Sequence, residues 1–171
     1  VSAASDTAIV APESLATLFA PTPATASGSA SPPWPNRLDG ISLEVRDSAG
    51  ATRLAPLTFV SPTRISFQVP AGTAPGEATL AVASDRGTSQ TGSMQVDAVA
   101  PGLFMVSREN FVPAATAVRV EPNGTQVPIP VFSCSGASCM PESIPLSAAG
   151  NRPVYLSFFG TGFRGANSGN V

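Results

Sequence analysis

The clearest pattern in the chain is a strict alternation of apolar and polar residues within short runs. In the run ISLEVRD, Ile41, Leu43 and Val45 fall on one side of an extended chain and polar residues fall on the other. The same alternation in RISFQVP and GEATLAVAS predicts further inward-facing residues: Ile65, Phe67, Val69, Ala78, Leu80 and Val82. Short strands at regular spacing, separated by turn residues, predict an immunoglobulin-like β-sandwich over residues 1–100.

A long polar connection interrupts this pattern near the N-terminus. Residues 21–36 read PTPATASGSASPPWPN, and this density of proline, alanine and serine predicts an extended surface loop. Trp34 lies among the prolines of this loop. Two interpretations stay open for Trp34: a hydrophobic plug that attaches the loop to the sandwich, or an exposed aromatic contact for a ligand.

The pattern changes after Pro101, where two runs are joined by a tight turn. AATAVRV and TQVPIPVF flank Asn123-Gly124, a pair that strongly favours a β-hairpin turn. Pro128 and Pro130 in the second run have no backbone N–H, so that arm belongs at a sheet edge. We therefore expect a β-hairpin extension at residues 101–150 that connects the sandwich to the last segment of the chain.

The chain contains two cysteines, Cys134 and Cys139, separated by four small residues in FSCSGASCM. A tight loop at this spacing can bring the two thiols within bonding distance. A zinc site would need more ligands, and a redox-active pair has two intervening residues. The spacing favours a small structural disulfide at a hairpin tip, and free thiols stay open as the alternative.

The last apolar run, VYLSFF at residues 154–159, predicts a buried strand followed by a Gly-Thr-Gly turn. Tyr155 is expected to be buried within it. An internal repeat strengthens this interpretation, because an offset of 140 aligns Leu15 with Tyr155 and Leu18 with Phe158. We expect residues 151–171 to be the first strand of a second sandwich, an orphan strand whose remaining partners are absent from this sequence.

Composition narrows the possible chemistry. All nine basic residues are arginine, the chain has no histidine, and the net charge is −2 with charged residues at only 12%. This gives no basic surface for nucleic acid. Without histidine or lysine, the Ser-His-Asp, Cys-His and Ser-Lys arrangements are excluded, and the carboxylates are scattered. We expect no enzyme activity, no cofactor and no metal site.

The compartment is also indicated by the sequence. No apolar run approaches the length of a membrane-spanning helix, so no membrane insertion is expected. The N-terminus VSAASDTAIV lacks the features of a signal peptide, which fits a mature protein whose signal has been removed. A disulfide forms in oxidising compartments. We therefore expect an extracellular or cell-surface protein.

Several motifs together resemble one protein family. SPTRISFQVP, VAPGLF, AATAVRVEPNGTQ, PVFSC and VYLSFFGTGFRG, spread from Ile9 to Gly165, are similar to the Solibacter-type C-terminal domain family of uncharacterised secreted bacterial proteins. The resemblance implies that Ser61 to Pro70 belongs to a first immunoglobulin-like, TIG-type domain. It also implies that Phe159 to Gly165 opens a second one. Members usually continue through that second domain, which this chain does not. The family implies no particular activity.

These observations lead to two expectations about function. The first is a non-catalytic structural or adhesive module whose partners are neighbouring subunits or other domains of a larger secreted protein. Without lysine, its strand edges lack a common protection against pairing. A strand made of Val154, Tyr155, Leu156, Phe158 and Phe159 could then add to a sheet in the next chain and build a fibre through residues 153–163. The alternative is a carbohydrate-binding accessory module with Trp34 as its contact.

Overall fold

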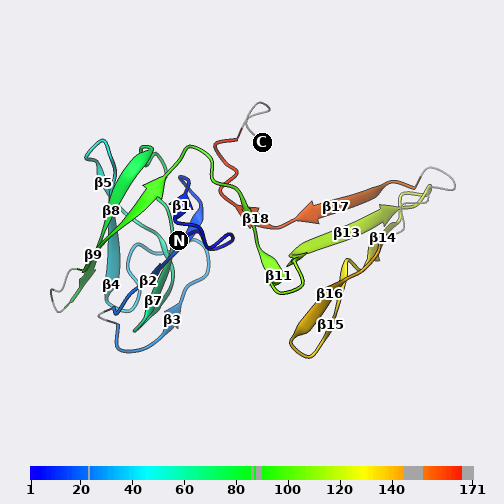
Figure 1. Cartoon of the computed structure of the whole chain (residues 1–171), viewed down its shortest axis with the longest axis horizontal. Helices are drawn as coiled ribbons and strands as arrows, with labels where there is room; N and C mark the ends of the chain where they lie inside the picture. The colour runs from blue at the N-terminus through cyan, green and yellow to red at the C-terminus, as the bar shows by residue number, and fades with distance from the viewer. Residues whose placement is uncertain (23, 86, 88–89, 145–151, 167–171) are drawn as a thin grey trace. The chain divides into compact units, whose positions relative to one another are not determined.

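The protein is built from β-strands and turns. A computed structural model describes residues 1–22, 24–85, 87, 90–144 and 152–166. Within these ranges no residue is helical, and the strands assemble into several separate sheets (Figure 1). The predicted all-β class is therefore confirmed.

The chain divides into two compact units. Residues 1–102 together with 161–171 form unit 1, and residues 103–160 form unit 2. The sequence suggested boundaries at 100 and 150, whereas the two units divide at 102/103 and at 160/161, and the segment 161–166 belongs to unit 1. That residues 151–171 open a second sandwich stays a prediction.

Unit 1 is a sandwich of two sheets. The first has the order β1-β9-β8-β4-β5, with strands β1 (Ile9–Val10), β9 (Gln90–Val96), β8 (Gly76–Ser84), β4 (Ile41–Arg46) and β5 (Thr52–Leu54). The second has the order β2-β7-β6-β3, with strands β2 (Leu15–Phe19), β7 (Arg64–Gln68), β6 (Leu57–Ser61) and β3 (Gly28–Ser29). All pairings are antiparallel except β1 with β9. This two-sheet arrangement is compatible with the immunoglobulin-like prediction.

The core of unit 1 lies between these sheets. The alternating residues predicted to face inward are all buried: Ile41, Leu43, Val45, Ile65, Phe67, Val69, Ala78, Leu80 and Val82. Phe67 is the largest of the fully buried side chains. The period-2 pattern therefore assigned the inner faces of β4, β7 and β8 correctly.

The loop at residues 21–36 contributes an edge strand. Within it, β3 pairs with β6 through Gly28 opposite Val60 and Ser29 opposite Phe59. Trp34 is half-buried, so it is neither a fully buried hydrophobic plug nor a fully exposed aromatic contact. The loop is thus partly incorporated into the second sheet.

One buried carboxylate ties two turns of unit 1 together. Asp47 follows β4, its side chain is 1% exposed, and it accepts hydrogen bonds from the backbone N–H groups of Ala49, Ala51 and Ala74. Arg53 Nη1 also donates to Asp47 Oδ2, at 2.7 Å. The Ala74 N–H bond is the main cause that lowers the pKa of Asp47 below its ordinary 3.8, with Arg53 and Ala51 adding to it against the effect of burial.

This carboxylate is expected to make unit 1 sensitive to acid. Because its folded pKa lies below the unfolded value, its contribution is complete above about pH 4 and is lost as the pH falls through the folded pKa. Asp47→Asn should therefore lower the stability at pH 7 and flatten its decline at acidic pH. Urea unfolding followed by the fluorescence of Trp34, the only tryptophan, measures both effects.

The control for this prediction is Asp85→Asn. Asp85 also pairs with an arginine, Arg37, but its side chain is 72% exposed, and exposed pairs contribute little. Its replacement should leave the stability at pH 7 nearly unchanged. An Asp47→Asn protein with the full acid sensitivity of the wild type would contradict the role of Asp47.

Unit 2 is smaller and is made of short ladders. Its main sheet has the order β14-β13-β17, with β14 (Gln126–Ile129), β13 (Ala115–Val120) and β17 (Val154–Phe158). Two further pairs are β11 (Met105–Ser107) with β12 (Val112–Pro113), and β15 (Phe132–Ser135) with β16 (Ser138–Pro141). β10 (Gly102–Leu103) pairs with β18 (Gly160–Thr161), and the division between the two units falls within both of these strands. The predicted Asn-Gly hairpin is present between β13 and β14, closed by the Gly124 N–H donating to the Glu121 carbonyl.

After β17 the chain returns to unit 1. The Leu15 N–H donates to Thr161 Oγ1 at 2.8 Å, and the Ala100 N–H donates to the carbonyl of Gly162. Arg164 forms an ion pair with Glu13, with 2.6 Å between Nη1 and Oε1. The Gly-Thr-Gly turn thus attaches the 161–166 segment to the first sandwich.

Candidate functional site on the β14–β13–β17 sheet

The candidate assembly strand, β17, is an edge strand of unit 2. It pairs antiparallel with β13, with Tyr155 opposite Val118 and Leu156 opposite Ala117. Among the described residues, no strand pairs with the other side of β17. The predicted strand at 154–159 is therefore present with one partner and one open edge.

The hydrogen-bond pattern shows which residues face that open edge. Phe159 N–H donates to the Ala114 carbonyl, and Val120 N–H donates to the Pro153 carbonyl. In an antiparallel ladder such bonded pairs alternate with unbonded pairs. The backbone groups of Tyr155 and Ser157 consequently point to β13. Those of the alternate residues, with Leu156 at the centre, point away from the sheet.

The opposite edge of this sheet is protected. The Glu121 N–H donates to the Thr125 carbonyl, and by the same alternation Pro128 on β14 directs its backbone away from β13. Proline offers no N–H there, so an added strand would lose a central hydrogen bond. The expected placement of Pro128 in an edge strand is confirmed. In the described part of this sheet, the β17 edge carries no such proline.

The prediction that Tyr155 is buried is wrong, because its side chain is 62% exposed. The neighbouring large apolar residues of the run are also exposed: Leu156, Phe158 and Phe159. The reason is that, within the described ranges, unit 2 has few apolar residues to pack over these side chains. In the described part of unit 2 the buried apolar residues are small or few, namely Val112, Ala115, Ala117 and Cys139, so this sheet has no core layer over β17.

Two ion pairs meet at Glu121, beside the start of β17. Glu121, at the turn end of β13, accepts from Arg119 Nε at 2.9 Å and from Arg152 Nε at 3.0 Å. Arg152 lies two residues before β17. Half-exposed pairs of this kind contribute modestly to stability, and the Arg152–Glu121 pair connects the segment before β17 to the end of β13.

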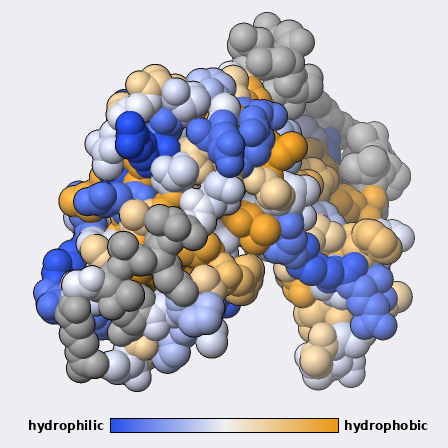
Figure 2. All heavy atoms as spheres, turned by 60° about the vertical axis from the view of Figure 1, so that its left-hand side comes forward, coloured by the Kyte–Doolittle hydropathy of each residue, from blue (hydrophilic) through white to orange (hydrophobic). Residues whose placement is uncertain are grey.

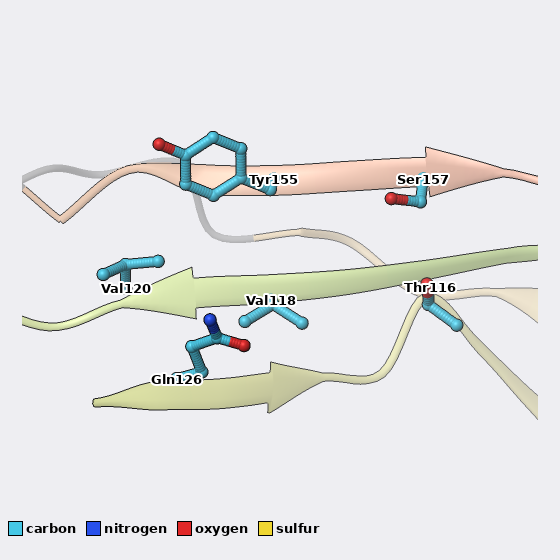
Figure 3. A pocket seen from close by; sticks show the side chains of 6 residues that line it. All are labelled: Thr116, Val118, Val120, Gln126, Tyr155 and Ser157. Atoms are coloured by element: carbon cyan, nitrogen blue, oxygen red, sulfur yellow. The ribbon is translucent and has the colours of Figure 1, made fainter. Parts of the chain in front are cut away.

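One face of the sheet carries a shallow groove of about 410 Å³. Its lining comes from all three strands: Thr116, Val118, Val120, Gln126, Tyr155 and Ser157 (Figure 3). Ser157 lies directly opposite Thr116, and Tyr155 directly opposite Val118. The groove therefore combines an aromatic ring, an apolar floor and three polar side chains, with no charged residue in its lining.

A second hollow, of about 510 Å³, is more apolar. It is lined chiefly by alanine, proline and aliphatic side chains of β13 and of the segment from β14 to β15, including Ala117, Ile129 and Phe132. On the side of the molecule drawn in Figure 2, hydrophobic residues likewise reach the surface in several patches among hydrophilic ones. Apolar surface is thus exposed at more than one place.

The predicted disulfide is present. Cys134 on β15 and Cys139 on β16 lie directly opposite each other and are joined by an S–S bond of 2.05 Å. Asn110 Nδ2 donates to the carbonyl of Cys139 at 2.9 Å, which connects this hairpin to the turn between β11 and β12. The disulfide is structural in this setting, because it closes a hairpin that has little core of its own.

The structure brings together only some of the residues singled out from the sequence. The five members of the candidate assembly strand lie in or directly beside β17, whereas Trp34 lies in unit 1. Five groove residues were not identified from the sequence: Thr116, Val118, Val120, Gln126 and Ser157. The alternation in ATAVRV and YLS places Thr116, Val118, Val120 and Ser157 on single faces of their strands. It does not make them neighbours, because that depends on the register between the strands.

The described residues contain no side-chain cluster that could hold a metal ion. Among them, no three of the potential ligand side chains come together. The described part of the chain also contains no helical segment with the length and hydropathy needed to span a membrane. Comparison of the chain with family models, with curated proteins and with solved structures found no match.

Proposed function

We propose that this protein is a non-catalytic extracellular module, structural or adhesive, that associates with a second copy of itself by strand addition through β17. The observation that carries the proposal is the asymmetry of the unit 2 sheet. Its β14 edge has Pro128 at the outward-facing position, whereas its β17 edge is apolar and has no second strand partner among the described residues. Exposed, unprotected strand edges are the usual sites of β-strand addition.

The composition of β17 supports the same proposal. Residues 153–163 contain no charged side chain and only one proline, Pro153, which precedes the strand. Charged residues and prolines are the common means of preventing edge pairing. Exposed Leu156 and Phe158 supply apolar surface that an added strand would cover.

The proposed compartment rests on the disulfide and on the resemblance to secreted bacterial proteins. A disulfide between Cys134 and Cys139 is stable in an oxidising environment outside the cytosol. The motifs from Ser61–Pro70 and Phe159–Gly165 resemble the Solibacter-type C-terminal domain family, which implies tandem immunoglobulin-like domains in secreted proteins. Both features support an exported module of a larger protein.

Pairing of β17 with its own counterpart has a simple geometry. In an antiparallel arrangement centred on Leu156, the two copies of this residue face each other and Val154 faces Phe158 of the second copy. No like charges oppose one another in this register. Such a contact is closed and gives a dimer. A fibre would require β17 to pair with a different edge of the next copy.

Leu156→Pro tests this proposal, because Leu156 directs its N–H to the open edge. The substitution removes that donor and leaves the ladder with β13 in place, so self-association should weaken by at least about tenfold, the effect of about 1.4 kcal/mol. Leu156→Ala keeps the N–H and is the matched control. Sedimentation velocity over a range of protein concentrations measures both variants and distinguishes a dimer from a longer assembly.

Two results would contradict the proposal. One is a wild-type protein that stays monomeric up to millimolar concentration. The other is association that Leu156→Pro and Leu156→Ala weaken equally, since the side chain rather than the strand edge would then form the contact. Far-ultraviolet circular dichroism confirms that each variant keeps its β-structure.

Carbohydrate binding through Trp34 is the second expectation from the sequence, and it has weaker support. Trp34 is half-buried in the loop of unit 1, which limits the ring face available for stacking. A sugar-binding role finds better chemistry elsewhere in the chain, at the groove beside Tyr155.

A further inference from the structure

The groove on unit 2 has the features of a site for an uncharged ligand. It is lined by six residues with no arginine, aspartate or glutamate among them. A phosphate or carboxylate ligand would find no counter-charge there. The lining instead alternates between apolar and uncharged polar side chains, which suits a ligand that carries both kinds of surface.

Tyr155 provides the aromatic part of this site. Its ring lies at one side of the groove in Figure 3, on the same face as Val118 and Val120 of the neighbouring strand. A tyrosine ring offers a flat apolar surface and a hydroxyl at its tip. The C–H face of a sugar ring can pack against that surface while its hydroxyl groups form hydrogen bonds.

The polar side chains provide the complementary hydrogen bonds. Thr116 and Ser157 each carry a hydroxyl that both donates and accepts, and Gln126 carries one group of each kind. Within the described residues these side chains have no hydrogen bond to the protein. Their capacity is therefore free for a ligand, and mixed donors and acceptors match the hydroxyl groups of a sugar better than they match any ion.

The shape of the groove favours a linear ligand. Thr116 and Val120 are four residues apart on β13, which corresponds to about 13 Å along the strand. That length exceeds a single sugar ring. We propose that this groove binds an uncharged linear glycan, with Tyr155 stacking on one sugar and Thr116, Ser157 and Gln126 bonding to its neighbours.

Titration of the full 171-residue chain with four uncharged hexasaccharides tests the proposal: cellohexaose, xylohexaose, mannohexaose and laminarihexaose. With at least one of these four sugars, two-dimensional 15N NMR should show chemical-shift changes confined to β13, the start of β14 and β17. Hexagalacturonate, which is anionic, should produce none. Tyr155→Ala should weaken binding about tenfold, as the loss of an aromatic stacking contact predicts. Tyr155→Phe should retain most of it.

Two further variants separate this site from neighbouring features and from folding defects. Phe158→Ala changes the opposite face of β17 and should leave sugar binding unaltered. Leu156→Pro removes strand addition but not the groove, so sugar binding that survives in this variant is independent of self-association. Gln126→Ala should weaken binding without touching β17 at all.

Three results would overturn the proposal. The first is an absence of shifts with all four sugars at millimolar concentration. The second is binding that Tyr155→Ala and Gln126→Ala leave unchanged. The third is a response to an uncharged proline-rich decapeptide and to none of the sugars, which would assign the groove to a peptide ligand.

Discussion

Gly162→Ala is expected to destabilise the attachment of the 161–166 segment by about 3 kcal/mol or more. Gly162 has a φ of 82°, a left-handed conformation in which any other residue is strained. A Cβ at this position would also overlap the backbone carbonyl oxygen of Ala100. The overlap involves backbone on both sides, so no side chain can rotate away to relieve it.

Hydrogen exchange is the most direct measurement of this effect. In the wild type, the Leu15 N–H donates to Thr161 Oγ1 and the Ala100 N–H donates to the Gly162 carbonyl. Both amides should be protected in the wild type and exchange much faster in Gly162→Ala. The loss cannot exceed the free energy that attaches the segment to unit 1, because beyond that point the segment detaches and the overlap is relieved.

Gly124→Ala is the matched control for this substitution. Gly124 has the same φ of 82°, but a Cβ there would meet nothing within 4 Å. Its replacement should therefore show only the conformational strain of a left-handed residue, about 1–2 kcal/mol. The difference between the two variants isolates the close approach of Gly162 to Ala100. Equal effects would contradict the proposed packing of the Gly-Thr-Gly turn.

The sequence predicted strands more reliably than it predicted what covers them. Alternation in ISLEVRD and RISFQVP identified the buried faces of β4 and β7. Successive side chains of a strand point to opposite faces, so once one face is apolar, only that face can turn to the core. The run at residues 154–159 was just as apolar, and it also forms a strand. Its burial was predicted wrongly. An apolar run is more stable when it is buried, but whether it is buried depends on other elements of the chain that pack against it.

The same limit explains the parts of the site that sequence analysis missed. Gly160-Thr161-Gly162 was recognisable as a turn, but its contact with Ala100 depends on the path of the chain between them. Gln126 and Ser157 carried no special motif, and they became groove residues only through the register of β14, β13 and β17. The Asn-Gly turn fixes the first of these registers locally. The register between β13 and β17 has no such turn to set it, because the two strands are far apart in the sequence. Across this pairing, Arg152 and Glu121 form an ion pair.

Phe67→Ala is expected to have the largest effect on the stability of unit 1. Phe67 lies on β7 between β2 and β6, opposite Ala16 and Leu57, and its side chain is 1% exposed. Truncation of a buried phenylalanine removes its transfer free energy and leaves a cavity, together about 3–5 kcal/mol. That is a large share of the roughly 5–15 kcal/mol by which domains are usually stable. Urea unfolding followed by Trp34 fluorescence should show a lower midpoint with an unchanged slope.

Two control variants show whether a loss of stability in Phe67→Ala comes from the core. Phe67→Leu keeps most of the volume and should lower stability by about 1–2 kcal/mol. Phe111→Ala removes a phenylalanine that is 82% exposed, and it should stay within about 0.5 kcal/mol of the wild type. If Phe67→Ala were as mild as Phe111→Ala, β7 could not present Phe67 to the core, and the sandwich derived from the alternation would be wrong. A graded series would instead show that the core of unit 1 is packed around Phe67, as the alternation in RISFQVP predicts.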